Sequence, residues 1–132
     1  MFIIFCKIST LHAVSYPIYH DPLDIRVMQQ GNVVRVVFEW IGDIHYNVKE
    51  SPNAASISFD RLAPYVLSKL TSKLPSKLTL VSMKPDQNRL SFTFQAYPSS
   101  QETMITRHYK QGSKVVLDFM FQDKRSLNHS SL

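Results

Sequence analysis

Residues 33–40 read VVRVVFEW, and this stretch decides the fold class of the chain. Successive side chains of a β-strand point to opposite faces of a sheet, so every second residue from Val34 to Trp40 shares one face. These residues are all apolar. The opposite face is amphipathic, because it holds Val33, Arg35, Val37 and Glu39. A period of two with one fully apolar face predicts a strand that packs against a core.

The same alternation recurs along most of the chain on both sides of this strand. It predicts further strands at 23–29, 44–49, 55–60, 77–84, 90–96, 103–109 and 114–121. Gly31, Gly42 and Gly112 stand at three of the turns between them. We therefore expect an all-β domain over residues 23–121, a β-sandwich of about eight mainly antiparallel strands with one short helix between the two halves.

Residues 61–74 interrupt the alternation. Leucines and lysines recur there with helical spacing on opposite sides; they are Leu67, Leu70, Leu74, Lys69 and Lys73. The pattern predicts a helix of about two or three turns that covers an open edge or end of a sheet and stops at Pro75. Because the helix falls between two groups of strands, we expect it to mark the passage from one sheet to the other.

The strand from 77 to 84 contains apolar residues at both parities. Strict alternation places Leu78 and Leu80 on one face and Val81 and Met83 on the other. This strand is therefore expected to present apolar side chains on both of its faces.

Both ends of the chain lack the strand pattern. We interpret residues 1–22 as an export leader, a disordered tail or an extra edge strand. The apolar run from Phe2 to Cys6 is shorter than the roughly 7–15 apolar residues of a signal peptide. No stretch approaches the roughly 18 apolar residues of a transmembrane helix. Residues 122–132 have no apolar period and are expected to form a flexible tail.

Composition excludes several classes of function. The chain has 132 residues, which suits one domain, and only three glycines. Neither GxGxxG nor GxxxxGK[ST] occurs, so nucleotide enzymes that use these loops are excluded. The single cysteine, Cys6, excludes an intramolecular disulfide and a cysteine-rich zinc site. None of the five histidines forms an HxH or HxxxH pair, and we predict no metal and no cofactor.

Catalytic motifs are also missing. No serine lies in a GxSxG nucleophile elbow. A hydrolase that uses two carboxylates is one alternative, with Glu39, Asp43, Asp60 and Asp118 as candidates. Roles in turns and caps explain these carboxylates more simply, so we predict that the protein is not an enzyme.

The last predicted hairpin carries the strongest binding signal. A two-residue turn at Gly112 and Ser113 places Arg107 opposite Asp118, and predicts an exposed ion pair worth on the order of 0–1 kcal/mol. The same hairpin gathers candidate ligand-binding residues, namely Arg107, Tyr109, Lys110 and Lys114. The net charge of +5 and the pI near 9.4 permit an anionic partner without requiring one.

Residues 33–48 resemble the opening of AMIN and AMIN-like domains. That family has a strand of the form R-hydrophobic-hydrophobic-F-[DE], followed through a short turn by a Y-x-V strand. The matching segments here are 35–39, which read RVVFE, and 46–48, which read YNV. Residues 57–60 and the closing hairpin from Arg107 to Phe119 are similar to later parts of these domains, with Lys114 in place of the usual arginine. The whole arrangement resembles the amino-terminal β-domain of certain large alphaproteobacterial envelope proteins.

The resemblance implies a non-catalytic β-sandwich in the periplasm that binds or positions something at the cell envelope, often peptidoglycan in AMIN domains. We therefore predict an envelope binding or targeting module whose partner is a cell-wall polymer or an envelope protein. The location is periplasmic if the leader functions and cytoplasmic if it does not. The alternatives are a nucleic-acid or anionic-surface binding domain, which lacks supporting motifs, and a protein that associates with itself.

Overall fold

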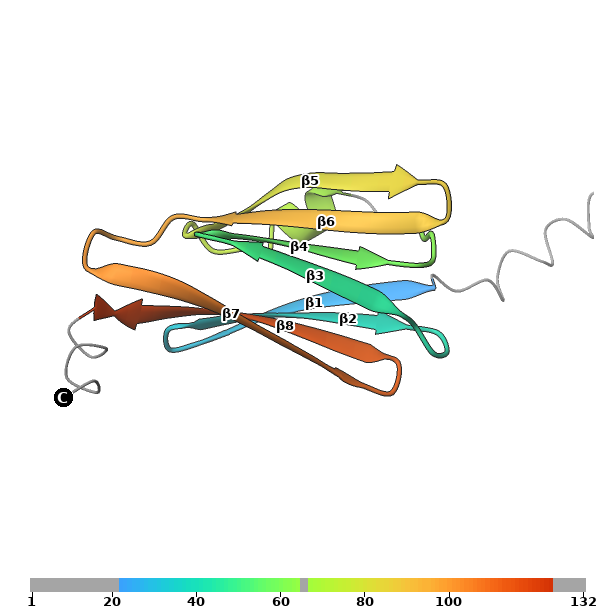
Figure 1. Ribbon diagram of the computed structural model, residues 1–132, viewed down its shortest axis with the longest axis horizontal. Coiled ribbons are helices and arrows are strands. Elements are labelled where there is room, and N and C mark those ends of the chain that lie inside the picture. Colours follow the sequence, from blue (N-terminus) through green and yellow to red (C-terminus); the bar gives the residue numbers. More distant parts are fainter. Residues whose placement is uncertain (1–21, 65–66, 125–132) are drawn as a thin grey trace, which may run out of the picture.

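The computed structural model describes residues 22–64 and 67–124, and this part of the chain contains eight strands and one helix (Figure 1). The elements are β1 (Leu23–Gln30), β2 (Val33–Trp40), β3 (Tyr46–Ser51), β4 (Ala54–Phe59), α2 (Leu67–Thr71), β5 (Leu78–Asp86), β6 (Arg89–Ala96), β7 (Glu102–Gln111) and β8 (Lys114–Asp123). Of the two expected tails, residues 1–21 and 125–132 lie outside the described residues. Gln122 and Asp123 were expected in the flexible tail, but they belong to β8.

The strands form two antiparallel sheets that stack as a β-sandwich (Figure 1). The first sheet has the order β1-β2-β8-β7 and the second sheet the order β3-β4-β6-β5. The predicted all-β sandwich is therefore confirmed. The strand that decided the fold class, β2, lies inside the first sheet between β1 and β8.

The predicted passage between the sheets was wrong. The helix α2 joins β4 to β5, and both of these strands belong to the second sheet. The chain crosses between sheets instead after β2 and again after β6. α2 contacts β5 and β1, which are edge strands of different sheets, and it buries Leu70 completely. It therefore closes the side of the sandwich between β1 and β5.

The helix is also shorter than the range 61–74 that its pattern suggested, since α2 spans Leu67–Thr71. After Thr71 the backbone tightens into a turn, in which the N–H of Lys73 donates to the carbonyl of Leu70 at 3.0 Å. Pro75 has no N–H to continue the helix. No helix among the described residues is long and apolar enough to cross a membrane.

Aromatic rings fill the space between the sheets. Phe38 and Trp40 of β2 each lie 5.0 Å, centroid to centroid, from Phe59 of β4. Phe38 also lies 5.1 Å from Phe92 of β6. All four side chains are buried, so the apolar face of β2 packs against the second sheet as its sequence predicts.

One strand departs from strict alternation. The register of β5 against β6 shifts between Leu80 and Ser82, which makes Val81 the extra residue of a β-bulge. Val81 is 54% exposed, whereas Met83 packs against the core. The prediction that Met83 lies on the face opposite to Leu80 was therefore wrong, because the bulge resets the parity of the strand.

Replacing Phe59 by Ala should lower the free energy of unfolding by about 3–5 kcal/mol, because it opens a cavity beside three aromatic rings. Urea unfolding measures the change. Val81→Ala, at the exposed bulge, should change the free energy by less than about 0.5 kcal/mol. Equal effects of the two substitutions would contradict this description of the core.

Candidate functional site

The outward-facing residues of the first sheet form four rows across β1, β2, β8 and β7. The first row holds Gln30, Val33, Met120 and Ile105, and the second Met28, Arg35, Asp118 and Arg107. The third row holds Arg26, Val37, Val116 and Tyr109, and the fourth Asp24, Glu39, Lys114 and Gln111. We call this surface the outer face. It combines apolar and charged side chains on the side of the sheet that points away from the core.

The outer face contains both buried and exposed apolar residues. Val37 and Val116 are buried beneath their neighbours, although they point away from the second sheet. Met28, Ile105 and Tyr109 are among the most exposed large apolar residues of the described chain, at 49%, 38% and 41%. The outer face therefore carries a second apolar cluster. Exposed Met28 lies at its β1 edge and exposed Ile105 and Tyr109 at its β7 edge, and between the edges lie Val33, Val37, Val116 and Met120.

The opposite surface of the sandwich has a different chemistry. The outward-facing residues of β4 and β6 are mainly small hydroxyl residues that pair with one another across the strands. The hydroxyls of Ser56 and Thr93 share a hydrogen bond of 2.9 Å, as do those of Ser58 and Ser91. This surface satisfies its own polar groups, so the exposed apolar cluster of the outer face distinguishes the first sheet from the second.

An ion pair between a buried carboxylate and a half-buried guanidinium group lies at the centre of the outer face. Arg35 of β2 donates through Nε to Oδ1 of Asp118 at 2.8 Å and through Nη2 to Oδ2 at 3.0 Å. The side chain of Asp118 is only 2% exposed. The hydrogen bonds to Asp118 raise the pKa of Arg35, and the loss of hydration opposes part of that rise. The pair is bidentate, which fixes the orientation of the guanidinium group.

The hairpin register is confirmed, but the predicted ion pair is wrong. Arg107 does lie opposite Asp118, and Gln111 lies opposite Lys114. Asp118 nevertheless pairs with Arg35, its neighbour on β2, and it is buried rather than exposed. The two paired residues are 83 positions apart in the sequence, and local alternation gives no signal for such a contact.

The structure separates the four predicted site residues. Arg107, Tyr109 and Lys114 share the outer face. Lys110 has the opposite parity, and its Nζ donates to the carbonyl oxygen of Ile44 at 2.6 Å. Lys110 therefore connects β7 to the segment before β3 and is not grouped with the other three.

The contacts around Lys110 close the side of the sandwich between β3 and β7. Its Nζ lies 2.7 Å from Oδ1 of Asp43, and this hydrogen bond lowers the pKa of Asp43. Beside it, the hydroxyl of Tyr46 and Nδ1 of His108 share a hydrogen bond of 2.9 Å. Burial raises the pKa of Tyr46. These groups have structural partners, and we leave them out of the candidate site.

Each carboxylate considered for a hydrolase has a structural partner. Glu39 pairs with Arg26, Asp43 with Lys110 and Asp118 with Arg35, and the carboxylate of Asp60 accepts the backbone N–H of His45. Within residues 22–64 and 67–124, no three His, Cys, Asp or Glu side chains lie close enough together to hold a metal ion.

A pocket of about 250 Å³ indents the outer face along its second row. It is lined by Met28, Gln30, Val33, Arg35, Arg107 and Asp118. The guanidinium groups of Arg35 and Arg107 come from strands on either side of β8, which carries Asp118. We call this cavity the arginine pocket.

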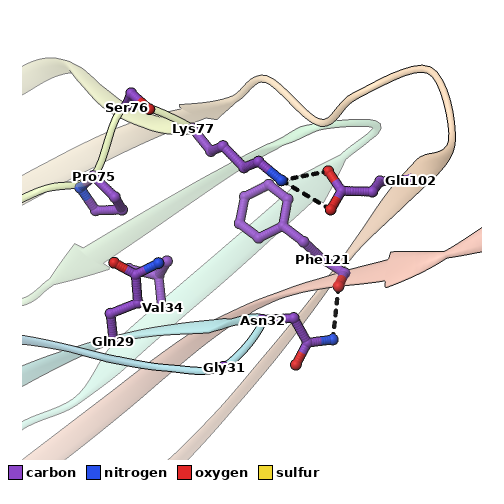
Figure 2. Close-up of a pocket in the computed structure, with 9 residues that line it drawn as sticks. All are labelled: Gln29, Gly31, Asn32, Val34, Pro75, Ser76, Lys77, Glu102 and Phe121. Carbon is purple, nitrogen blue, oxygen red and sulfur yellow. Dashed lines mark hydrogen bonds and ion pairs between the residues drawn. The ribbon is translucent and has the colours of Figure 1, made fainter.

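A second cavity, of about 330 Å³, opens between the two sheets beside the turn from β1 to β2 (Figure 2). Its walls are Gln29, Gly31, Asn32, Val34, Pro75, Ser76, Lys77, Glu102 and Phe121. Nζ of Lys77 lies 2.7 and 2.8 Å from the two carboxylate oxygens of Glu102, and 5.4 Å from the centroid of the Phe121 ring. The two charges cancel, and they connect the segment before β5 to the start of β7. We call this cavity the inter-sheet cleft.

Comparisons of the chain with protein-family models, with curated proteins and with solved structures find no match. Function must therefore be inferred from the surfaces of this chain. Of the two cavities described above, the arginine pocket adjoins exposed apolar residues and includes the guanidinium group of Arg107, which has no ion pair among the described residues. The inter-sheet cleft holds charges that neutralise each other. We take the outer face as the candidate site.

Removing Arg35 should destabilise the protein more than removing Asp118. Arg35→Ala leaves the buried carboxylate of Asp118 without its two hydrogen-bond donors, at a cost of about 1–3 kcal/mol. Asp118→Ala leaves the Arg35 side chain, which is 41% exposed and keeps contact with water, so its cost should be about half as large. Urea unfolding at neutral pH compares them. The reverse order would contradict the burial of Asp118 on the outer face.

Lys77→Ala should destabilise the protein in a pH-dependent way. The hydrogen bond from Lys77 lowers the pKa of Glu102, and the N–H of Ser99 adds to this effect. A lowered pKa means that the stabilisation is present above the unfolded-state pKa of about 4.3 and is lost as the pH falls through the folded-state value. The difference in unfolding free energy between wild type and variant should therefore be larger at pH 7 than at pH 2.5. A constant difference would show that Lys77 does not act through the Glu102 charge.

Proposed function

We propose that the protein is a non-catalytic binding module of the bacterial cell envelope that docks a protein partner through its outer face. The observation that carries the proposal is that Met28, Ile105 and Tyr109 are all exposed on one side of the sandwich, at the two edges of a row-by-row apolar surface. On the other side, hydroxyl groups of β4 and β6 bond to each other, and the exposed large apolar residue of its described strands is Val81 at the bulge of β5. An apolar cluster rimmed by polar groups is typical of a protein interaction site.

The residue types of the outer face support a protein partner. Tyrosine, methionine and arginine are enriched at protein interfaces, and hot spots favour tyrosine and arginine. The two middle rows supply all three types, in Met28, Tyr109, Arg35 and Arg107. The bidentate contact between Arg35 and Asp118 holds the Arg35 guanidinium group in place, so little further entropy is lost when a partner binds there.

The charge of the outer face favours a protein over a nucleic acid. The four rows contain four cations and three carboxylates, a net charge of +1. Binding of nucleic acid draws its affinity from many phosphate contacts made by Lys and Arg. The overall charge of +5 is therefore not concentrated at the candidate site.

The envelope location comes from the AMIN-like pattern of residues 35–39 and 107–119. Peptidoglycan is the second candidate ligand. Arg107 and Lys114 favour it, because both are exposed cations with no ion pair among the described residues. The same two cations also complement acidic side chains at the edge of a protein partner.

A photo-crosslinking residue placed at Ile105 should yield an adduct with an envelope protein in native cells, because Ile105 lies within the apolar cluster. The same residue placed at Lys49, exposed on the second sheet, should yield none. Met28→Glu should abolish the Ile105 adduct by placing a charge in the cluster. Val81→Glu, a matched change at an exposed apolar residue of the second sheet, should leave it intact.

Two results would contradict the proposal. One is equal labelling from Ile105 and Lys49, which would show that partner proteins contact the outer face no more than the second sheet. The other is sedimentation with purified sacculi that is lost in the double variant R107A/K114A, without any protein adduct. That result would identify cell-wall polymer as the ligand in place of a protein.

A further inference from the structure

We infer that the arginine pocket is a subsite for a single carboxylate group, supplied by an Asp or Glu side chain of the partner. This inference rests on the proposed function and adds the chemistry of its central contact. The pocket brings together two guanidinium groups, a buried carboxylate and two apolar side chains, within about 250 Å³.

The hydrogen-bond donors of the pocket are not all used. A guanidinium group has five N–H donors. Arg35 uses its Nε and Nη2 atoms for Asp118, which leaves its Nη1 group for a ligand. Arg107 lines the same pocket and makes no ion pair with any described residue. Donors from two strands therefore border one cavity.

The charge of the pocket matches a monoanion. Arg35 and Asp118 neutralise each other through their bidentate contact, and Arg107 adds one positive charge. A carboxylate carries one negative charge, whereas a phosphomonoester carries about −1.5 to −2 at neutral pH. Planar carboxylates also fit the fork of a guanidinium group. The pocket therefore suits a carboxylate better than a phosphate.

The walls of the pocket suit the rest of an acidic side chain. Met28 and Val33 line it beside the two arginines, so the methylene groups of a Glu or Asp side chain meet apolar surface. Asp118 anchors Arg35 before any ligand arrives, and this pre-organisation reduces the entropy lost on binding. A charged hydrogen bond at such a site is stronger than one between neutral groups.

The test uses the isotope-labelled protein and small probes in place of the partner. N-acetylglutamate N-methylamide, which has one carboxylate, should cause saturable NMR shifts of the amide signals of Met28, Arg35 and Arg107. The isosteric glutamine compound, which has no charge, should cause none. Inorganic phosphate should bind more weakly than the glutamate compound.

Variants identify the group that binds the probe. Arg107→Ala should raise the half-saturating concentration of the glutamate compound by about tenfold, which corresponds to one hydrogen bond to a charged group. Lys49→Ala removes an exposed cation from the second sheet, away from the outer face, and should leave it unchanged. Folding of each variant is checked by the dispersion of its amide spectrum.

The possible failures are distinguishable. Equal shifts with the glutamine compound, tighter binding of phosphate, or full binding by R107A would each overturn the carboxylate subsite. If the crosslinks from Ile105 form but no carboxylate-specific shift occurs, the proposed docking face stands and the subsite is wrong. If the shifts occur but no protein adduct forms, the subsite stands and the proposed protein partner is wrong.

Discussion

The ion pair between Arg35 and Asp118 joins the two central strands of the first sheet, and the architecture of the outer face depends on it. A buried carboxylate is costly unless a cation and hydrogen bonds compensate it, and Arg35 supplies both. A shift of β8 by one residue would move Asp118 into the aromatic core and expose Leu117 or Phe119. The pair therefore opposes such a shift and fixes which residues of β8 face outward.

The two faces of the first sheet differ because the ion pair fixes which residues of β8 point outward. Between the sheets, aromatic rings of β2, β4, β6 and β8 pack together with aliphatic side chains in one buried core. On the outer face, Asp118 pairs with Arg35, so Arg107 has no ion pair among the described residues. Arg107 lies on the same face as exposed apolar side chains. The same interaction that stabilises the first sheet thus creates the charged pocket through which we propose that it binds.

Local periodicity predicted the strands well, and long-range pairing explains what it missed. The alternation that begins with residues 33–40 predicted the strands of the sandwich, and the turn at Gly112 predicted the register of β7 against β8. Contacts between distant segments decide three features that periodicity missed. They are the pairing of Asp118 with Arg35, the hydrogen bond from Lys110 to the carbonyl of Ile44, and the position of α2. The sequence of the hairpin suggested Arg107, Tyr109 and Lys114 as candidates, and the order of the strands was needed to place Met28 and Arg35 on the same face as these three.

Asp118 holds Arg35 and leaves Arg107 without an ion pair among the described residues, and NMR of the arginine side chains measures this difference directly. A guanidinium group held by a bidentate contact rotates slowly about its Nε–Cζ bond, whereas a free one rotates quickly. We predict slow rotation and separate Nη signals for Arg35, and fast rotation with a single averaged signal for Arg107. Slow rotation of Arg107 together with fast rotation of Arg35 would show that Asp118 pairs across the hairpin, and would contradict both the buried pair and the free cation of the outer face.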